Sequence, residues 1–186
     1  MSEYLTKARS IVKDWNLDPD FHVIFLPRSG SHMLVNALNH HPEIDCSHSD
    51  QGHSGYGDLK GHAQCTVEGV KKALILTRNA DDRVKSFFTS LAKDTGDNHS
   101  TVPVEVERMD YHKAKGRFKS QRIKGDKFLE RVKGIPERLE IPYEEITGDR
   151  DIREIPEEWS YRICDFLGVK RMVLKTDLHK PVVHES

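Results

Sequence analysis

Two short segments of the chain combine arginine with small hydroxyl side chains, a pattern suited to holding an anion. The first lies between an apolar run and a stretch with helical spacing, and it reads Pro27, Arg28, Ser29, Gly30, Ser31 and His32. Backbone amides at a helix start are unpaired and carry the positive end of the helix dipole. Gly30 lets the backbone approach an anion, the two serines add hydroxyl donors, and Arg28 adds a permanent charge. A turn whose serines only cap the helix is the alternative reading of this segment.

The second segment begins at Arg78, directly after the apolar run 73–77. Ser86 follows eight residues later, about two helical turns on. We expect Arg78 at the carboxyl end of a strand, where α/β folds bind their ligands. Arg78 and Ser86 could therefore hold one further phosphate. The spacing GxxxxGK[ST] is absent, which disfavours an ordinary P-loop ATPase.

Apolar periodicity predicts the elements that position these segments. Short, apolar and partly β-branched runs predict strands over 22–26, 73–77 and 139–143, with a strand end near 58–62. Helical spacing predicts helices over 3–15, 32–39, 80–91 and 156–167. The alternation of strand, turn and helix is typical of a parallel α/β unit.

Individual residues mark where some of these elements end. Asn79 or Asp81 is expected to cap the helix that follows Arg78. Pro142 favours an edge strand or a strand end, and Gly168 is a stop signal for the last helix. Polar, glycine-rich composition predicts a loop over 41–57, and the tail from Lys170 is expected to be irregular.

Composition bounds the class of protein. The 186 residues favour one domain, and 36% hydrophobic with 32% charged residues allow a core under a highly charged surface. The formal net charge of −1 gives no case for nucleic-acid or membrane binding, so an anion site has to be local. Three cysteines without a CxxC pair indicate neither a disulfide framework nor a cysteine zinc site. With no signal peptide and no apolar run near the roughly 20 residues of a membrane span, a cytoplasmic protein is expected.

The anion-binding segments resemble motifs of one enzyme family. Residues 27–31 are similar to the 5′-phosphosulfate loop of sulfotransferases, particularly the PRSGTT sequence of the tyrosylprotein type. Residues 78–86 resemble the 3′-phosphate motif of cytosolic sulfotransferases, including the Arg-to-Ser interval. Residues 141–146 and 163–168 are similar to the family's YEDL and FLG region, which is mainly structural. Residues 94–135 match nothing in the family.

The resemblance implies a fold and an activity. The fold would be a three-layer α/β/α sandwich with a short, mainly parallel, P-loop-like sheet, in one domain over 1–186, with 94–135 as an acceptor-side insertion or flap. The activity would be transfer of a sulfuryl group from 3′-phosphoadenosine 5′-phosphosulfate (PAPS) to a hydroxyl or amine, leaving adenosine 3′,5′-bisphosphate (PAP). The acceptor would be a small molecule, glycan or peptide. The oligomeric state is not predicted. The basic stretch 113–133 is read either as a solvated helix face or as part of the flap.

The resemblance also assigns roles to the residues of both motifs. Residues 28–32 would hold the 5′-phosphosulfate, and Arg28 would neutralise charge on the departing phosphate. Arg78 and Ser86 would hold the 3′-phosphate. The sequence departs from the family where His32 replaces a hydroxyl residue and Met33 occupies a place often held by tryptophan; many members also have lysine in place of the arginine at position 28.

The acceptor needs a base near neutral pH, for which histidine is suited. Lys60, Gly61 and His62 resemble the Lys-Thr-His segment of cytosolic sulfotransferases, which implies His62 as base and Lys60 as electrostatic partner. His48 is the rival, because an alignment with the tyrosylprotein type places the catalytic glutamate of that group close to His48, Ser49 or Asp50. This chain has no glutamate there, so His48 or Asp50 would have to substitute. We prefer His62 to His48 at this point. A metal site at His48, Asp50 and His53 fits no strong signature, and no metal is expected.

Three other functions stay open. A non-catalytic module that binds adenosine bisphosphate would keep the fold without turnover, as the departures from the family motifs suggest. A kinase-like phosphotransferase would need ATP and Mg²⁺, and the missing Walker lysine counts against it. A nucleic-acid binder resting on residues 113–133 is the weakest alternative, so no nucleic-acid partner is expected.

Overall fold

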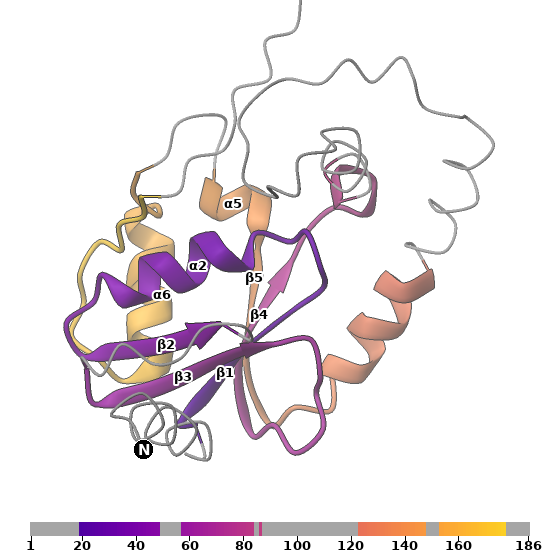
Figure 1. The fold of residues 1–186 in the computed structure, drawn as a ribbon, viewed down its shortest axis with the longest axis horizontal. Helices are drawn as coiled ribbons and strands as arrows, with labels where there is room; N and C mark the ends of the chain where they lie inside the picture. The colour runs from indigo at the N-terminus through magenta and orange to yellow at the C-terminus, as the bar shows by residue number, and fades with distance from the viewer. Residues whose placement is uncertain (1–18, 49–56, 84–85, 87–122, 148–152, 178–186) are drawn as a thin grey trace, which may run out of the picture.

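The computed structural model describes residues 19–48, 57–83, 86, 123–147 and 153–177. A five-stranded sheet forms its centre, in the order β2-β3-β1-β4-β5, and every neighbouring pair of strands is parallel (Figure 1). The strands are β1 (Phe21–Phe25), β2 (Ile44–His48), β3 (Leu59–Gln64), β4 (Lys72–Thr77) and β5 (Glu137–Pro142). The α/β class and the parallel sheet predicted from the sequence are confirmed.

Helices cover both faces of this sheet. Helices α2 (Ser31–Asn39), α5 (Tyr143–Thr147) and α6 (Glu157–Leu167) contribute to one apolar cluster with alternate residues of the strands. A helix over 123–132 packs on the opposite face, where Phe128 and Val132 meet Ile24 and Ile75. Because successive strand side chains point to opposite faces, β1 and β4 contribute to both clusters. The predicted three-layer arrangement is thus present in the described residues (Figure 1).

Most predicted boundaries agree with the structure to within two residues. Asn79 caps the helix that starts at Ala80, since its Oδ1 accepts a hydrogen bond from the amide of Asp81 at 2.8 Å. Gly168 ends α6 in the left-handed conformation at φ 78°, as expected for a C-terminal glycine. Pro142 is the last residue of β5, which is an edge strand.

The loop predicted over 41–57 is wrong in part, because Ile44–His48 forms β2 and is buried at every position. The segment 94–135, which shows no clear pattern in the sequence, contains the helix over 123–132. The expected helix over 3–15, residues 87–91 of the expected helix after Arg78, and the segment 94–122 lie outside the described residues. Within the described ranges, no helix has the length and apolar character to cross a membrane.

The strand order places the turns after β1 and β4 side by side. From β1 the chain runs through α2 to β2 at one edge of the sheet, whereas from β4 it continues to β5 at the other edge. The two strands are direct neighbours, with Phe25 in register with Leu76. Open parallel sheets bind ligands at the carboxyl ends of strands where the chain direction diverges in this way. Both arginine segments therefore start at the same edge of the sheet, the edge at which such folds bind ligands.

Candidate functional site

The turn after β1 is tight and leaves the start of α2 without a side-chain cap. The amide of Ser29 donates to the carbonyl of Leu26 at 3.1 Å and closes the turn. Arg28 and Gly30 both adopt positive φ, at 70° and 89°. Gly30 is the N-cap of α2, and no side chain caps this helix. The serines therefore do not act as N-caps, which removes the alternative that the sequence alone left open.

The two arginine segments meet at this turn. The Arg78 Nη1 donates to the carbonyl oxygen of Arg28 at 2.9 Å. The Arg28 side chain extends to Ser86, donating from Nε to Oγ at 3.3 Å and from Nη2 to the backbone oxygen at 3.4 Å. The resemblance assigns Ser86 to the same phosphate as Arg78, but in the structure Ser86 contacts Arg28. The residues assigned to the two phosphates thus form one connected cluster.

This cluster brings positively charged side chains together. In the part of the chain that the structure describes, neither Arg28 nor Arg78 forms an ion pair with a carboxylate. Burial lowers the pKa of Arg28, and the nearby charge of Arg78 lowers it further. The same two causes, in the same order, lower the pKa of Arg83, which is 3% exposed. Arg83 is a third guanidinium that the sequence reading did not single out.

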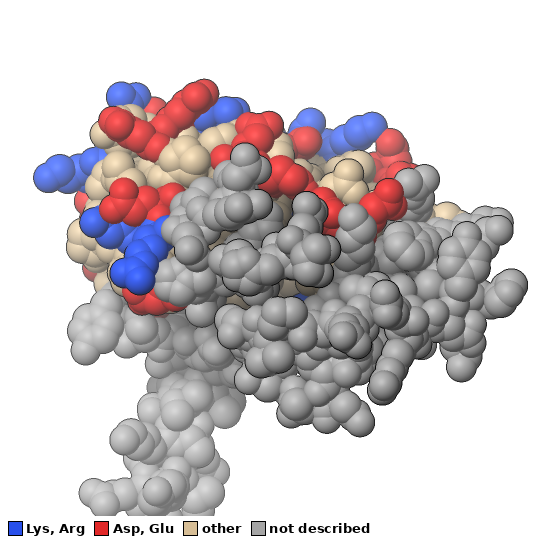
Figure 2. Space-filling model, turned by 90° about the horizontal axis from the view of Figure 1, so that it is seen from above, with Lys and Arg blue, Asp and Glu red and all other residues tan. Residues whose placement is uncertain are grey.

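The described residues on one face of the molecule show no continuous basic patch (Figure 2). On the described residues of the face seen in Figure 2, acidic and basic side chains are interspersed. This agrees with the formal net charge of −1. An anion would therefore be attracted by the turn itself, as the composition required.

Two buried polar atoms at the turns have no partner in the described structure. These are the Ser29 Oγ and the Arg78 Nε. A buried donor without a partner costs about 1–3 kcal/mol, so such atoms mark places where a ligand can complete the hydrogen bonding. Together with the uncapped start of α2 and two guanidiniums that form no ion pair within the described ranges, these atoms fit the phosphate groups of an anionic nucleotide.

A tyrosine that the sequence reading assigned to a structural region links both turns. Tyr143 directly follows β5, and its ring lies below the guanidinium of Arg78, with the Arg78 Cζ 4.5 Å from the ring centroid. A Cβ at Gly30 would lie 2.5 Å from the Tyr143 Cδ2, so the ring packs directly on the glycine. Glu144 Oε1 accepts a hydrogen bond from the amide of Asn79 at 2.9 Å. The sequence signal that could have identified Tyr143 as a site residue was its position directly after a predicted strand. Arg78 has the same kind of position.

Of the two histidines considered as bases, His48 lies at the turn. It is the last residue of β2 and is buried, with its Nε2 3.0 Å from the Ser31 Oγ. Its ring stacks on that of His32 at a centroid distance of 3.9 Å and an interplanar angle of 13°. Phe25 packs against it from the end of β1, at 5.3 Å between ring centroids. The loop, the start of α2 and the end of β2 therefore converge on His48.

His62 lies on the opposite face of the sheet. Its neighbour Ala63 belongs to the cluster on the α2 face, so the His62 side chain points the other way. Its Nδ1 is 2.8 Å from the Ser47 Oγ, and its ring meets that of His22 edge to face at 6.5 Å. His62 is in register with His22, near the start of β1. This placement reverses our preference, and the geometry favours His48.

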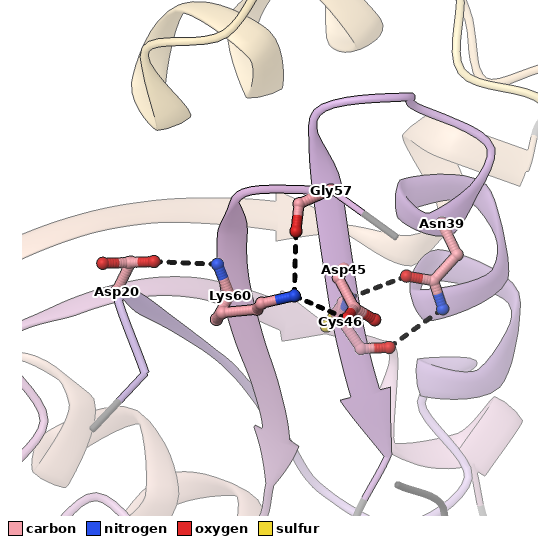
Figure 3. A network of polar contacts seen from close by, with 6 residues as sticks. All are labelled: Asp20, Asn39, Asp45, Cys46, Gly57 and Lys60. Atoms are coloured by element: carbon pink, nitrogen blue, oxygen red, sulfur yellow. Dashed lines mark hydrogen bonds and ion pairs between the residues drawn. The ribbon is translucent and has the colours of Figure 1, made fainter. Parts of the chain in front are cut away.

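Lys60 is the second residue of β3 and so lies at the end of the strand away from the loop; Figure 3 shows its polar contacts. Its Nζ donates to the Asp45 Oδ2 at 2.9 Å and to the carbonyl of Gly57 at 2.8 Å, and its amide donates to the Asp20 Oδ2 at 2.8 Å. Asp20 precedes the five residues of β1, which span about 16 Å at 3.3 Å per residue. The structure therefore does not bring Lys60 to the anion-binding turns, because the ammonium group is paired with a buried carboxylate at the other end of the strand.

The structure gives no support to a metal centre among its described residues, which contain no group of three metal-ligating side chains. Asp50 and His53 of the triad considered from the sequence lie outside the described residues.

Comparison with known proteins identifies the fold. No family model matches the sequence, and no curated protein matches it. Among solved structures, the chain is similar to mouse sulfotransferase SULT7A1 complexed with PAP, with a TM-score of 0.57 and 17% identity over 87% of this chain. It is also similar to the sulfotransferase from Alicyclobacillus acidocaldarius, with a TM-score of 0.50 and 18% identity, covering 91% of this chain and 88% of that one. The chain spans 62% of the length of the mouse enzyme. Its α/β fold with an all-parallel sheet is the sulfotransferase fold.

Proposed function

We propose that this chain binds PAPS and transfers its sulfuryl group to a hydroxyl or amine of an acceptor. The single observation that carries the proposal is the junction of the two arginine turns, where Arg78 donates to the carbonyl of Arg28. Beside this bond lie two buried polar atoms that have no partner among the described residues. The similarity in fold to a mouse sulfotransferase complexed with PAP supports the choice of nucleotide.

The chain's own residues divide the binding task between them. The uncapped start of α2, with Ser29 and Ser31, would hold the 5′ end of the nucleotide, and Arg28 would neutralise the charge that develops there. Arg78 would hold the 3′-phosphate with Ser86. When bound, PAPS supplies the activated sulfuryl group for the transfer.

We assign the role of base to His48. A base has to lie within hydrogen-bond reach of the reacting group, and His48 is already within 3.0 Å of the Ser31 hydroxyl in the anion-binding loop. The stack with His32 limits rotation of the His48 ring, which would keep its nitrogen directed at this edge. His32 would serve as a contact to the 5′ end in place of the hydroxyl residue usual in the family.

The acceptor would be a small molecule, glycan or peptide, and we place the protein in the cytoplasm. The acceptor pocket would be formed by loops at the carboxyl edge of the sheet, where the anion-binding turns lie. We treat the whole chain as one catalytic domain.

Calorimetric titration with PAP and with AMP tests the nucleotide assignment. We expect tighter binding of PAP, because only PAP carries the 3′-phosphate that Arg78 would hold. Arg78→Ala should weaken PAP binding by about 10- to 100-fold, the range for loss of hydrogen bonds to a charged group, and leave AMP binding nearly unchanged. Arg171→Ala is the matched control, since Arg171 pairs with Asp165 on α6 and should affect neither nucleotide. Equal affinity of the wild type for both nucleotides would refute the proposal.

Turnover is tested separately. The rate of PAPS consumption is measured with a panel of phenols, alcohols and amines. With at least one of these acceptors it should exceed the rate measured without an acceptor. Tight PAP binding with no transfer to any acceptor would favour the non-catalytic module instead.

A further inference from the structure

The sheet has two edge strands within the described residues, β2 and β5, and contacts from α2 and the turn after it cover β2. The Asn39 side chain pairs with the backbone of Cys46, donating from Nδ2 to the carbonyl at 2.9 Å and accepting from the amide at 2.7 Å (Figure 3). The amide of Ile44 donates to the carbonyl of His41 at 3.1 Å. No comparable bond from a described residue reaches the outer side of β5. An open strand edge is a template for pairing with another strand.

Alternate residues of β5 direct their backbone groups away from β4. The amide of Glu137 donates to the carbonyl of Lys71, next to β4, at 3.0 Å, and in a parallel ladder every second residue bonds to the same neighbour. Arg138 and Glu140 therefore direct their amides and carbonyls to the outer side. Among the described residues, neither backbone has a hydrogen-bond partner on that side. The open groups thus lie in the middle of the strand.

Proline limits this open stretch at both ends. Pro136 precedes β5 and Pro142 ends it. Both lie at the even positions, like Arg138 and Glu140, whose backbone groups face outward. Because proline has no amide hydrogen, the donors for a further strand lie only at the two positions between them. A strand that pairs with β5 is thereby confined to a short stretch.

This stretch is complementary to itself when a second copy runs antiparallel to it about a two-fold axis at Leu139. Arg138 then lies opposite Glu140 of the second copy, and Glu140 opposite its Arg138. Each of these pairs would exchange both backbone hydrogen bonds, as an antiparallel ladder requires, and would bring opposite charges together. Pro136 would face Pro142 of the second copy, so no amide donor is left unpaired at either end.

The side chains beside the edge fit the same arrangement. Arg138 and Glu140 are both exposed, and the 3.7 Å between the Arg138 Nε and the Glu140 Oε1 of one chain is a loose contact. A cavity of about 410 Å³ beside the strand is lined by Asp126, Leu129, Glu130, Lys133 and Glu140. Carboxylates outnumber ammonium groups in this lining, so it would attract the guanidinium of the second copy. Leu129 is 41% exposed and adds apolar surface there.

We propose that the outer edge of β5 is a homodimer interface, at which two copies of this chain pair their β5 strands antiparallel about Leu139. The two five-stranded sheets would become continuous through an isologous contact, in which each chain uses the same surface. This interface does not depend on the proposed sulfuryl transfer. It is small, so we expect a dissociation constant of about 10 μM to 1 mM, the range for a few backbone hydrogen bonds with charged neighbours.

Hydrogen exchange measured by nuclear magnetic resonance on the full chain tests the pairing without any substitution. Between about 20 μM and about 1 mM protein, the amides of Arg138 and Glu140 should come to exchange at least about twofold more slowly. The average mass in sedimentation equilibrium should rise toward that of a dimer over the same range. The amide of Leu139 is the internal control, because it faces β4 and should be protected at every concentration.

Three results would overturn the proposal. A monomer at about 1 mM would show that the edge does not pair with itself at the expected affinity. A dimer in which exchange at Arg138 and Glu140 is unchanged would place the contact elsewhere. Protection of both amides at every concentration would show that another segment of the same chain covers the edge.

A charge exchange tests the register. Glu140→Lys should weaken dimerisation at least about tenfold, because it places a lysine opposite Arg138 of the second copy, and Arg138→Glu should do the same with two carboxylates. A mixture of these two variants should form a heterodimer with an affinity within about threefold of the wild type, since each variant supplies the charge that the other lacks. Glu154→Lys is the matched control, because Glu154 is exposed and pairs with Lys175 outside the sheet, and it should dimerise like the wild type.

Circular dichroism first establishes that each variant is folded. Folded variants that dimerise as tightly as the wild type, or a mixture that forms no heterodimer, would overturn the register. Where a variant does not fold, hydrogen exchange in the wild type still decides whether the β5 edges pair.

Discussion

Replacing Gly30 by alanine tests the packing between the first turn and β5. Gly30 has a φ of 89°, in the left-handed region that L residues rarely adopt. An added Cβ would also overlap the ring of Tyr143, lying 2.5 Å from its Cδ2. The ring is rigid and buried, and the Arg78 guanidinium packs on it, so the ring has little room to move aside.

Two terms make up the expected loss of stability. Left-handed backbone costs an alanine about 1 kcal/mol relative to glycine, and forcing extra volume into a packed site costs about 1–3 kcal/mol. We expect the free energy of unfolding of Gly30→Ala to fall by about 2–4 kcal/mol in urea titrations. Gly69→Ala is the matched control, because Gly69 has a φ of 75° and no atom within 4 Å of its added Cβ. That variant should lose only the backbone term of about 1 kcal/mol.

A double variant isolates the contact between position 30 and the Tyr143 ring. In Gly30→Ala combined with Tyr143→Leu, the overlap is relieved, so the combined loss should be at least about 1 kcal/mol smaller than the sum of the single losses. Equal losses for Gly30→Ala and Gly69→Ala, together with additivity in the double variant, would refute the packing of Tyr143 on the loop.

Three further predictions concern residues away from this contact. His48→Asn should lower the rate of PAPS turnover at least about 100-fold and leave PAP binding unchanged. His62→Asn should keep the rate within about twofold of the wild-type rate. A steady-state assay in which His62→Asn has the larger effect would support His62 as the base. Lys60→Met should lower the free energy of unfolding by about 3–5 kcal/mol in urea, because it removes the ammonium from the fully buried carboxylate of Asp45. A changed PAP-to-AMP affinity ratio would contradict the remote position of the pair. Burial raises the pKa of the Cys46 thiol above its unfolded value, so stability is retained below about pH 8.5 and should decline by up to about 1.4 kcal/mol per pH unit above it. Cys46→Val should show a shallower decline in unfolding measurements from pH 8 to 10, and identical slopes would contradict this origin.

The central strands and the turn after β1 were predictable because their signals are local. The apolar runs that form β1 and β4 are buried on both faces, which produces continuous hydrophobic sequence. The turn between β1 and α2 carries a glycine with positive φ that its sequence position anticipates. The meeting of Arg28 and Arg78 follows from parallel strands that end at one edge of the sheet.

Strand β2 could not be predicted because its stabilising contacts are not local. Asp45 and Ser47 give it a polar composition, yet both are buried and bonded to Lys60 and His62 of β3. The sequence of β2 alone does not reveal these partners. Only the pairing of the two strands turns a polar segment into buried structure.

Our change of preference from His62 to His48 as the proposed base has the same cause. Similarity of the segment Lys60 to His62 to a family motif carries no information on strand register. Since β3 continues to Gln64, Lys60 lies near the beginning of the strand and His62 faces away from α2. His48 reaches the loop because β2 ends there. The polar composition of β2 had led to the prediction of a loop in its place.

A crystal structure with PAP bound would test most directly whether the two arginine turns form one nucleotide site. We predict the 5′-phosphate at the start of α2, within hydrogen-bond distance of the Ser29 Oγ or the Ser31 Oγ. The 3′-phosphate should contact the Arg78 guanidinium, with the Arg78 Nε or an Nη as donor. PAP bound elsewhere, or with neither phosphate near Arg28 or Arg78, would contradict the proposed site.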